Sequence, residues 1–253
     1  WAVAYLRSRV AVLDNTGTIW LSDVGTTNFD PVNTFTAESS SDETRGIRVF
    51  DQFFFVGGQL TIEPFQDIGS GNPPWARVNG VIIEEVGIAN RDCFTNTPTA
   101  LYILSDGKIP YRIVSFQAIP LTDRNPGIAE IFEDYTVSTA YLQSFRVFGQ
   151  NIVTYHFPTE GKVWAFAEET QLWFELDHDT TKDMHLGKTF SYLFNKNLVG
   201  DRENGNIYEI DEDTFQNNSV TVIRERIFRP FAGETVGSPR AKLQMKLIQF
   251  AVE

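Results

Sequence analysis

The 253-residue sequence predicts an all-β fold, and three features lead to that prediction. Most apolar runs, such as residues 10–13, 49–56 and 147–157, consist of β-branched or aromatic residues and show alternation. Aromatic residues make up 13% of the chain, which has only 2 methionines. Alternation places successive side chains on opposite faces, the pattern of strands in a sheet. The third feature is a glycine turn that recurs along the chain.

In this recurring turn, a branched apolar residue follows a glycine by two positions, and an aromatic residue usually comes next. The five turns contain Gly17, Gly58, Gly107, Gly161 and Gly205. Their spacings are 41, 49, 54 and 44 residues, with a mean of 47, close to the roughly 40–50 residues of a four-stranded propeller blade. Glycine suits tight hairpins because it tolerates positive φ. We therefore expect a β-propeller.

In a propeller, the apolar residue that follows each glycine should occupy the same position in its blade. Equivalent strand positions are expected for Ile19, Leu60, Ile109, Val163 and Ile207. We expect about six blade-like units in a single domain over residues 1–253. The sixth consists of strands over residues 220–228 and 243–252 with a turn between them. Because the chain starts at Trp1 rather than Met, we expect it to be a fragment of a longer one.

One short helix is the only departure from strands that the sequence predicts. From residue 126 to about residue 135, apolar residues follow the i, i+3, i+4, i+7 spacing of a helical face. Pro126 stands at its start, where proline is favoured. We therefore expect an all-β fold with at most one short helix.

Composition excludes several classes of protein. The formal net charge is −12, and phosphate binding needs the clustered lysine and arginine that this chain lacks. The single cysteine, Cys93, excludes an intramolecular disulfide framework and a cysteine-clustered zinc site. No apolar run approaches the roughly 18 residues of a membrane helix. We expect neither tight DNA binding nor membrane insertion.

A glycosidase is the enzyme class that a propeller first suggests. Its chemistry needs two carboxylates roughly 5–10 Å apart, whereas adjacent acids such as Glu84 and Glu85 point to opposite faces of a strand. The turn after residue 13 approaches the Ser-x-Asp-x-Gly-x-Thr-Trp signature of sialidases. However, Asp14 precedes Gly17 by three residues instead of two. No catalytic residue is predicted.

The three histidines raise the question of a metal site. His178 lies between two aspartates, and His185 follows Asp183 by two residues, which would suit mixed oxygen and nitrogen ligands. A solvated polar loop explains the same pattern, because no cysteine or spaced histidine pair accompanies it. His156 alternates with apolar residues and is interpreted as a packed strand residue. No metal ligand and no cofactor is predicted.

Two aromatic-bearing loops are the candidate contact sites for partner proteins. The loop over residues 25–41 carries Phe29 and Phe35, and the loop over residues 69–80 carries Trp75. Loops tolerate variation that propeller strands do not, and tryptophan is enriched at interface hot spots. The alternative is that these side chains pack on the domain itself. A contact role predicts exposed rings, whereas packing predicts buried ones.

The order of short motifs along the chain resembles that of a known family. The motifs run from Ile19-Trp20-Leu21-Ser22-Asp23 and Asn28-Phe29-Asp30-Pro31 through Thr61-Ile62-Glu63-Pro64-Phe65 and Leu101-Tyr102-Ile103-Leu104-Ser105-Asp106-Gly107 to Tyr155-His156-Phe157-Pro158, Leu172-Trp173-Phe174-Glu175, Gly205-Asn206-Ile207-Tyr208 and Ile223-Arg224-Glu225-Arg226. In this order they resemble the packaged-DNA stabilisation proteins, the tail hub or head-completion proteins of short-tailed bacteriophages. The resemblance covers nearly the whole chain.

This resemblance implies a non-enzymatic, structural role in the virion tail, with assembly in the host cytoplasm. Such proteins close the portal channel after packaging, and they connect the portal adaptor protein to the tailspikes and the tail needle. Six copies per virion are implied, and there are no catalytic residues to carry over. Two alternatives stay open: a carbohydrate- or protein-binding propeller such as a lectin or adhesin, and a propeller glycosidase.

Overall fold

The computed structural model describes residues 1–37, 42–178, 182–211, 213–214 and 216–221. Over these residues the chain forms antiparallel sheets and one helix, as the sequence predicts. The expected sixth unit lies almost entirely outside the described residues, because it covers residues 220–252. Among the described helices, none is long and apolar enough to span a membrane.

Each sheet consists of strands that follow one another in the sequence. The first contains β1 (Ala2–Leu6), β2 (Arg9–Leu13), β3 (Thr18–Ser22) and β4 (Phe29–Thr36). The second contains β5 (Thr44–Phe50), β6 (Phe53–Gly58), β7 (Thr61–Asp67) and β8 (Trp75–Arg77), with β9 (Ile83–Glu84) also paired to β7. The third contains β10 (Phe94–Asn96), β11 (Leu101–Leu104), β12 (Pro110–Val114) and β13 (Gln117–Pro120).

The remaining elements lie in the C-terminal part of the described chain. Helix α1 (Pro126–Glu133) precedes the fourth sheet, which contains β14 (Tyr141–Val147), β15 (Gln150–Phe157), β16 (Lys162–Ala167) and β17 (Leu172–Glu175). The fifth sheet contains β18 (Gly187–Leu193), β19 (Lys196–Asp201) and β20 (Ile207–Glu209). The short strands β21 (Gln216–Asn217) and β22 (Val220–Thr221) pair only with each other.

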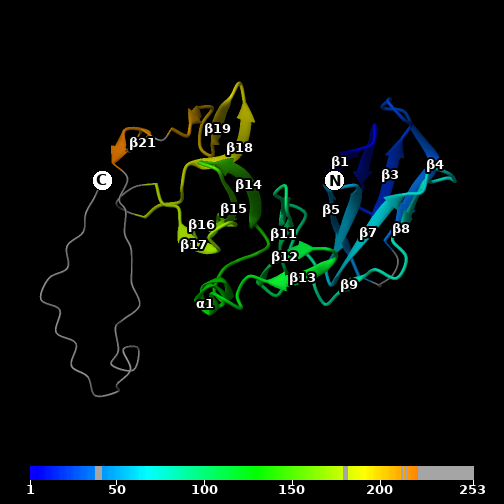
Figure 1. The fold of residues 1–253 in the computed structure, drawn as a ribbon, viewed down its shortest axis with the longest axis horizontal. Coiled ribbons are helices and arrows are strands. Elements are labelled where there is room, and N and C mark those ends of the chain that lie inside the picture. The colour runs from blue at the N-terminus through cyan, green and yellow to red at the C-terminus, as the bar shows by residue number, and fades with distance from the viewer. Residues whose placement is uncertain (38–41, 179–181, 212, 215, 222–253) are drawn as a thin grey trace, which may run out of the picture.

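The core lies between consecutive sheets, as expected for blades packed face to face. The first strands of neighbouring sheets lie next to one another, from β1 beside β5 to β14 beside β18, and Figure 1 shows the sheets following one another from right to upper left. One apolar cluster fills each of the first three interfaces, around Leu21 and Phe54, Ile62 and Ile103, and Tyr102 and Tyr155. Burial of these apolar faces is the main driving force for the arrangement.

Four glycines of the repeat lie in the turn between the second and third strands of their sheets, and Gly58 is the last residue of the second strand, β6, directly before that turn. The predicted equivalence of the turns is therefore confirmed, but that of the following apolar residues is only partly correct. Ile19 and Val163 are each the second residue of a third strand and are 0% exposed. Leu60 and Ile207 are 56% and 70% exposed. Leu60 differs because β7 starts two residues later after its glycine, so that Ile62 takes the buried position. Ile207 is the first residue of β20, and Ile109 precedes β12, so neither is the second residue of a third strand.

Carboxylates stabilise two of these turns in the same way. The Asp14 side chain accepts hydrogen bonds from the backbone N–H groups of Thr16 and Thr18 and from Trp20 Nε1, at 2.8, 3.0 and 2.8 Å. In the fifth sheet, Asp201 accepts hydrogen bonds from two turn N–H groups and, at 2.7 Å, from the hydroxyl of Tyr208. In each turn, the carboxylate therefore connects the turn to an aromatic side chain on the following strand.

These hydrogen bonds lower the pKa of Asp14 to about 2, chiefly through Thr16 and Trp20. We expect Asp14→Asn to lower the free energy of unfolding at pH 7 by about 1–2 kcal/mol, since bonds to a charged acceptor are lost. The difference from wild type should shrink as the pH falls from about 4 to about 2, where Asp14 itself becomes protonated. Urea unfolding across this pH range measures the difference in the free energy of unfolding. Asp51→Asn, at an exposed turn, is the matched control. Equal losses in both variants would contradict the role of the Asp14 bonds.

Two long strands predicted from alternation are each divided by a turn. The run over residues 49–56 turns at Asp51, with φ of 55°, and the run over residues 147–157 turns at Phe148 and Gly149, with φ of 50° and 77°. Alternation continues through these two-residue turns, which is why it failed to reveal them. The predicted helix is confirmed but ends at Glu133, and it buries Ile128 and Phe132.

Candidate functional site

Trp75, the strongest candidate for a partner contact, is a core residue. It lies in β8, paired with β7, and is only 3% exposed. Its ring centroid lies 4.4 Å from that of Phe54. Of the two alternatives for Trp75, packing on the domain is therefore the correct one, because the residues after the proline pair return to the sheet and place the indole in the interface between the first two sheets.

Phe29 and Phe35 lie in a strand, so the loop expected over residues 25–41 is also incorrect in part. Both belong to β4, and both are partly buried. Phe35 packs on Phe65 with ring centroids 4.6 Å apart, which makes it a core residue of the first interface. Phe29 pairs with Ser22 at the other end of the strand. A contact role for Phe29 stays a prediction.

A large apolar surface lies on the outer face of the first sheet, which sequence reasoning did not identify. Trp1, Val3 and Tyr5 are 73%, 68% and 65% exposed. The strand register places Val3 opposite Val12 and Tyr5 opposite Val10, so the apolar surface extends across β1 and β2. The signal was present in the sequence, since both strands are apolar at nearly every position. Alternation alone cannot reveal which of two apolar faces is covered.

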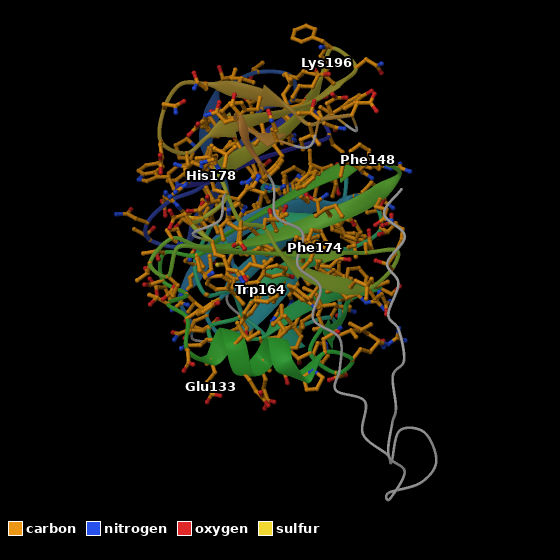
Figure 2. All side chains as sticks on the ribbon, turned by 90° about the vertical axis from the view of Figure 1, so that its left-hand side faces the viewer. Glu133, Phe148, Trp164, Phe174, His178 and Lys196 are labelled. Carbon is orange, nitrogen blue, oxygen red and sulfur yellow. The ribbon has the colours of Figure 1, made fainter. Side chains whose placement is uncertain are left out.

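A second apolar surface is the hairpin tip between β18 and β19. Tyr192, Leu193 and Phe194 are 63%, 50% and 89% exposed. The neighbouring Lys196 lies at the upper end of the molecule in Figure 2, opposite the end where α1 carries Glu133. Exposed apolar patches of this kind on a folded protein commonly mark interaction sites. The two surfaces, on the first and fifth sheets, differ in sequence and shape.

A groove of about 710 Å³ lies between the fourth and fifth sheets. Its apolar wall includes Phe145, Val147, Ile152, Leu176, Phe190 and Val199. The rings of Phe145 and Phe190 stack across it, 4.0 Å apart and 9° from parallel. Glu209 and Asp211 contribute carboxylates to the same lining.

Two titratable residues inside the domain, Glu168 and Cys93, are placed as structural residues. The Glu168 carboxylate accepts hydrogen bonds from Tyr102 and Asn151, both at 2.9 Å, and from two threonines of the third sheet. Both of its oxygens are therefore occupied, and it joins two blades. Cys93 is buried, and burial raises its pKa to about 12. A thiol in that environment is a poor nucleophile.

The histidine segment does not assemble a metal site within the described residues. Over that part of the chain, no group of three or more histidine, cysteine, aspartate or glutamate residues is placed to hold a metal ion. His178 donates its backbone N–H to the carbonyl of Asp183 at 2.9 Å, so the two ends of the segment pair as a short bridge. His156 is 0% exposed and binds Thr154 Oγ1 through Nε2 at 2.9 Å, as expected for a packed strand residue.

A family comparison identifies the class of protein. Residues 2–215 match the model of the Phage_stabilise family, described as bacteriophage P22 Gp10, β-propeller. The chain belongs to this family. It is a structural β-propeller protein of a bacteriophage and is associated with the virion. This match confirms the resemblance based on motif order.

Solved structures agree on the fold alone. The chain is 12% identical to the dihydro-heme d1 dehydrogenase NirN, with a TM-score of 0.50 over 89% of this chain and 47% of that one. Hsv2 of Kluyvelomyces marxianus gives 12% identity and a TM-score of 0.47, over 79% of this chain and 58% of that one. This chain therefore spans about half the length of these structures. None of the curated proteins matches it.

Proposed function

We propose that this protein is a tail hub of a short-tailed bacteriophage, which closes the portal channel and stabilises the packaged genome. In this role it connects the portal adaptor protein to the tailspikes and the tail needle, and it assembles in the host cytoplasm without catalysing a reaction. The family match over residues 2–215 is the single observation that carries the proposal. The distribution of exposed apolar residues supports it.

The two apolar surfaces suit a closed ring of subunits. In a cyclic assembly of more than two copies, one patch of each subunit meets a different patch of its neighbour. The outer face of the first sheet, with Val3 and Tyr5, and the hairpin tip, with Phe194, are two such unlike patches. We propose six copies around the portal axis, with further contacts made only on the virion.

Removing the hairpin-tip aromatic tests the proposal directly. Phe194 has φ of 54° and is 89% exposed, and asparagine tolerates that backbone conformation. We expect Phe194→Asn to keep the fold but to reduce attachment of tail parts to DNA-filled heads at least tenfold in an assembly assay. Leu172→Asn, at a residue 56% exposed in β17, is the control. Normal assembly of the Phe194 variant would show that the hairpin tip is not part of the interface.

The negative net charge predicts that the protein does not bind DNA. A formal net charge of −12 repels phosphate, which lets a genome pass a channel wall without being retained. We expect no measurable affinity for duplex DNA in about 0.15 M salt. Fluorescence anisotropy with a labelled duplex measures this. Tight binding that weakens steeply with salt would contradict the proposal.

The alternatives make different predictions for the isolated protein. A lectin or adhesin propeller would retain glycans on an array, and a glycosidase would turn over a glycoside panel with activity lost on replacing one carboxylate. Neither result is expected of a structural protein of the Phage_stabilise family. Either result would favour its own class over the tail hub.

A further inference from the structure

The groove between the fourth and fifth sheets lacks a covering element among the described residues, although it is lined like a binding surface. Phe174 on β17 lines one side and is 39% exposed, while Tyr208 on β20 lines another. Filling an apolar groove of about 710 Å³ is favourable because it removes its lining from water. A largely apolar occupant is therefore favoured.

Charge narrows the choice of occupant. The groove carries the carboxylates of Glu209, which pairs with Lys196 at 2.6 Å, and of Asp211, which accepts a hydrogen bond from Thr214 at 2.7 Å. In the whole chain the charge is distributed unevenly, because residues 1–221 contain 15 basic and 30 acidic residues, whereas residues 222–253 contain 6 basic and 3 acidic ones. A segment that is both apolar and basic complements an apolar groove with acidic side chains.

One segment of this chain combines these properties and starts beside the groove. Residues 222–231 contain five apolar residues and three arginines, Arg224, Arg226 and Arg229, with a single glutamate. The described chain ends nearby, since Ser219 itself lines the groove and β22 ends at Thr221. Intramolecular binding is favoured because a tethered segment is present at a high effective concentration.

We propose that residues 222–231 of the same chain bind in the groove between the fourth and fifth sheets. Their apolar side chains replace water against Phe145, Phe190 and Val199, and their arginines pair with Glu209 and Asp211. Binding of this segment covers the apolar faces of two sheets. This proposal concerns the single subunit and does not depend on the tail-hub role.

Disulfide trapping in the full chain tests the proposal. Phe174→Cys places a thiol on the groove lining, and Phe228→Cys places one in the segment; Phe174→Cys with Phe250→Cys is the control pair. The native Cys93 is 0% exposed, and burial raises its pKa to about 12, so it does not compete. Under mild oxidation we expect the 174–228 pair to form an intramolecular disulfide at least fivefold faster than the 174–250 pair. Equal rates would overturn the proposal.

The products also distinguish the occupants. Disulfide-linked dimers in place of linked monomers would show that a second copy fills the groove and would overturn the proposal. Reversing charge with Arg224→Glu and Arg226→Glu should slow trapping several-fold, whereas Arg240→Glu and Lys242→Glu should not. An unchanged rate of disulfide formation in the Arg224→Glu, Arg226→Glu variant would show that the acidic lining does not contribute to binding of the segment.

A second measurement avoids changes to the groove itself. Ile227→Asp with Phe228→Asp should expel the segment, so that amide hydrogen exchange in β17 and β20 becomes at least threefold faster than in the wild-type full chain. Leu247→Asp with Phe250→Asp is the matched control. Exchange in β17 and β20 that is the same in both variants and in wild type would overturn the proposal even if the cysteine variants fail to fold.

Discussion

Replacing Trp75 with Ala should lower the free energy of unfolding by about 3–5 kcal/mol. The indole is 3% exposed and packs against Phe54, with ring centroids 4.4 Å apart. Removing it leaves a cavity between the first two sheets in addition to the lost transfer free energy. Chemical denaturation at pH 7 measures the change.

Trp1→Ala is the matched control, because the same substitution is made at a residue that is 73% exposed. It should change the free energy of unfolding by less than about 0.5 kcal/mol. If the two variants have equal stability, Trp75 is not part of the core. If Trp75→Ala is as stable as wild type but fails in tail assembly, the original interpretation as a contact residue is restored.

Much of the fold could be predicted because the repeat has a physical cause. A hairpin between the second and third strands needs a tight turn, so glycines such as Gly17 and Gly161 mark every blade. The helix could be predicted because Ile128 and Phe132 lie one turn apart and share a buried face. These features depend on local geometry, which a single sequence records.

The turns that begin at a phenylalanine could not be predicted, because their signal is weak. Phe148 and Phe194 both adopt positive φ, at 50° and 54°, which is unusual for aromatic residues. Each is followed by Gly149 or Asn195, residues that tolerate such angles. Pairing between the flanking strands overrides the preference of the phenylalanine. Local sequence alone does not indicate that pairing.

The exposed apolar surfaces could not be predicted for a related reason. Exposure of an aromatic ring depends on which sheet lies over it, and that is a property of the whole fold. Trp75 is buried and Phe35 is partly buried in the cluster between the first two sheets, whereas Tyr5 and Val3 are exposed on β1. Loop composition favoured the first pair, and only the packing of the sheets reveals the second.

Acidification from pH 7 to pH 5 should lower the free energy of unfolding by about 4 kcal/mol through two histidines. Burial, followed by the nearby His185, lowers the pKa of His156 to about 3. Burial, His178 and Arg202 lower the pKa of His185 to about 4. In the unfolded chain both titrate near 6.5, so below that pH the unfolded state binds more protons and is favoured. The loss due to His185 ends near pH 4 and that due to His156 near pH 3, where each becomes protonated in the folded protein.

His156→Phe separates this effect from general acid sensitivity. Phenylalanine cannot titrate, and it keeps a ring against Tyr141, which stacks on His156 with ring centroids 4.3 Å apart. Thr154 retains its own hydrogen bond to the carbonyl of Gln143. The loss between pH 7 and pH 5 should therefore fall to about 2 kcal/mol, as measured by denaturant unfolding at each pH. Because the lowered pKa of Asp14 affects stability only below about pH 4, an unchanged loss in the variant would mean that His156 is already protonated, or exposed to water, in the folded protein.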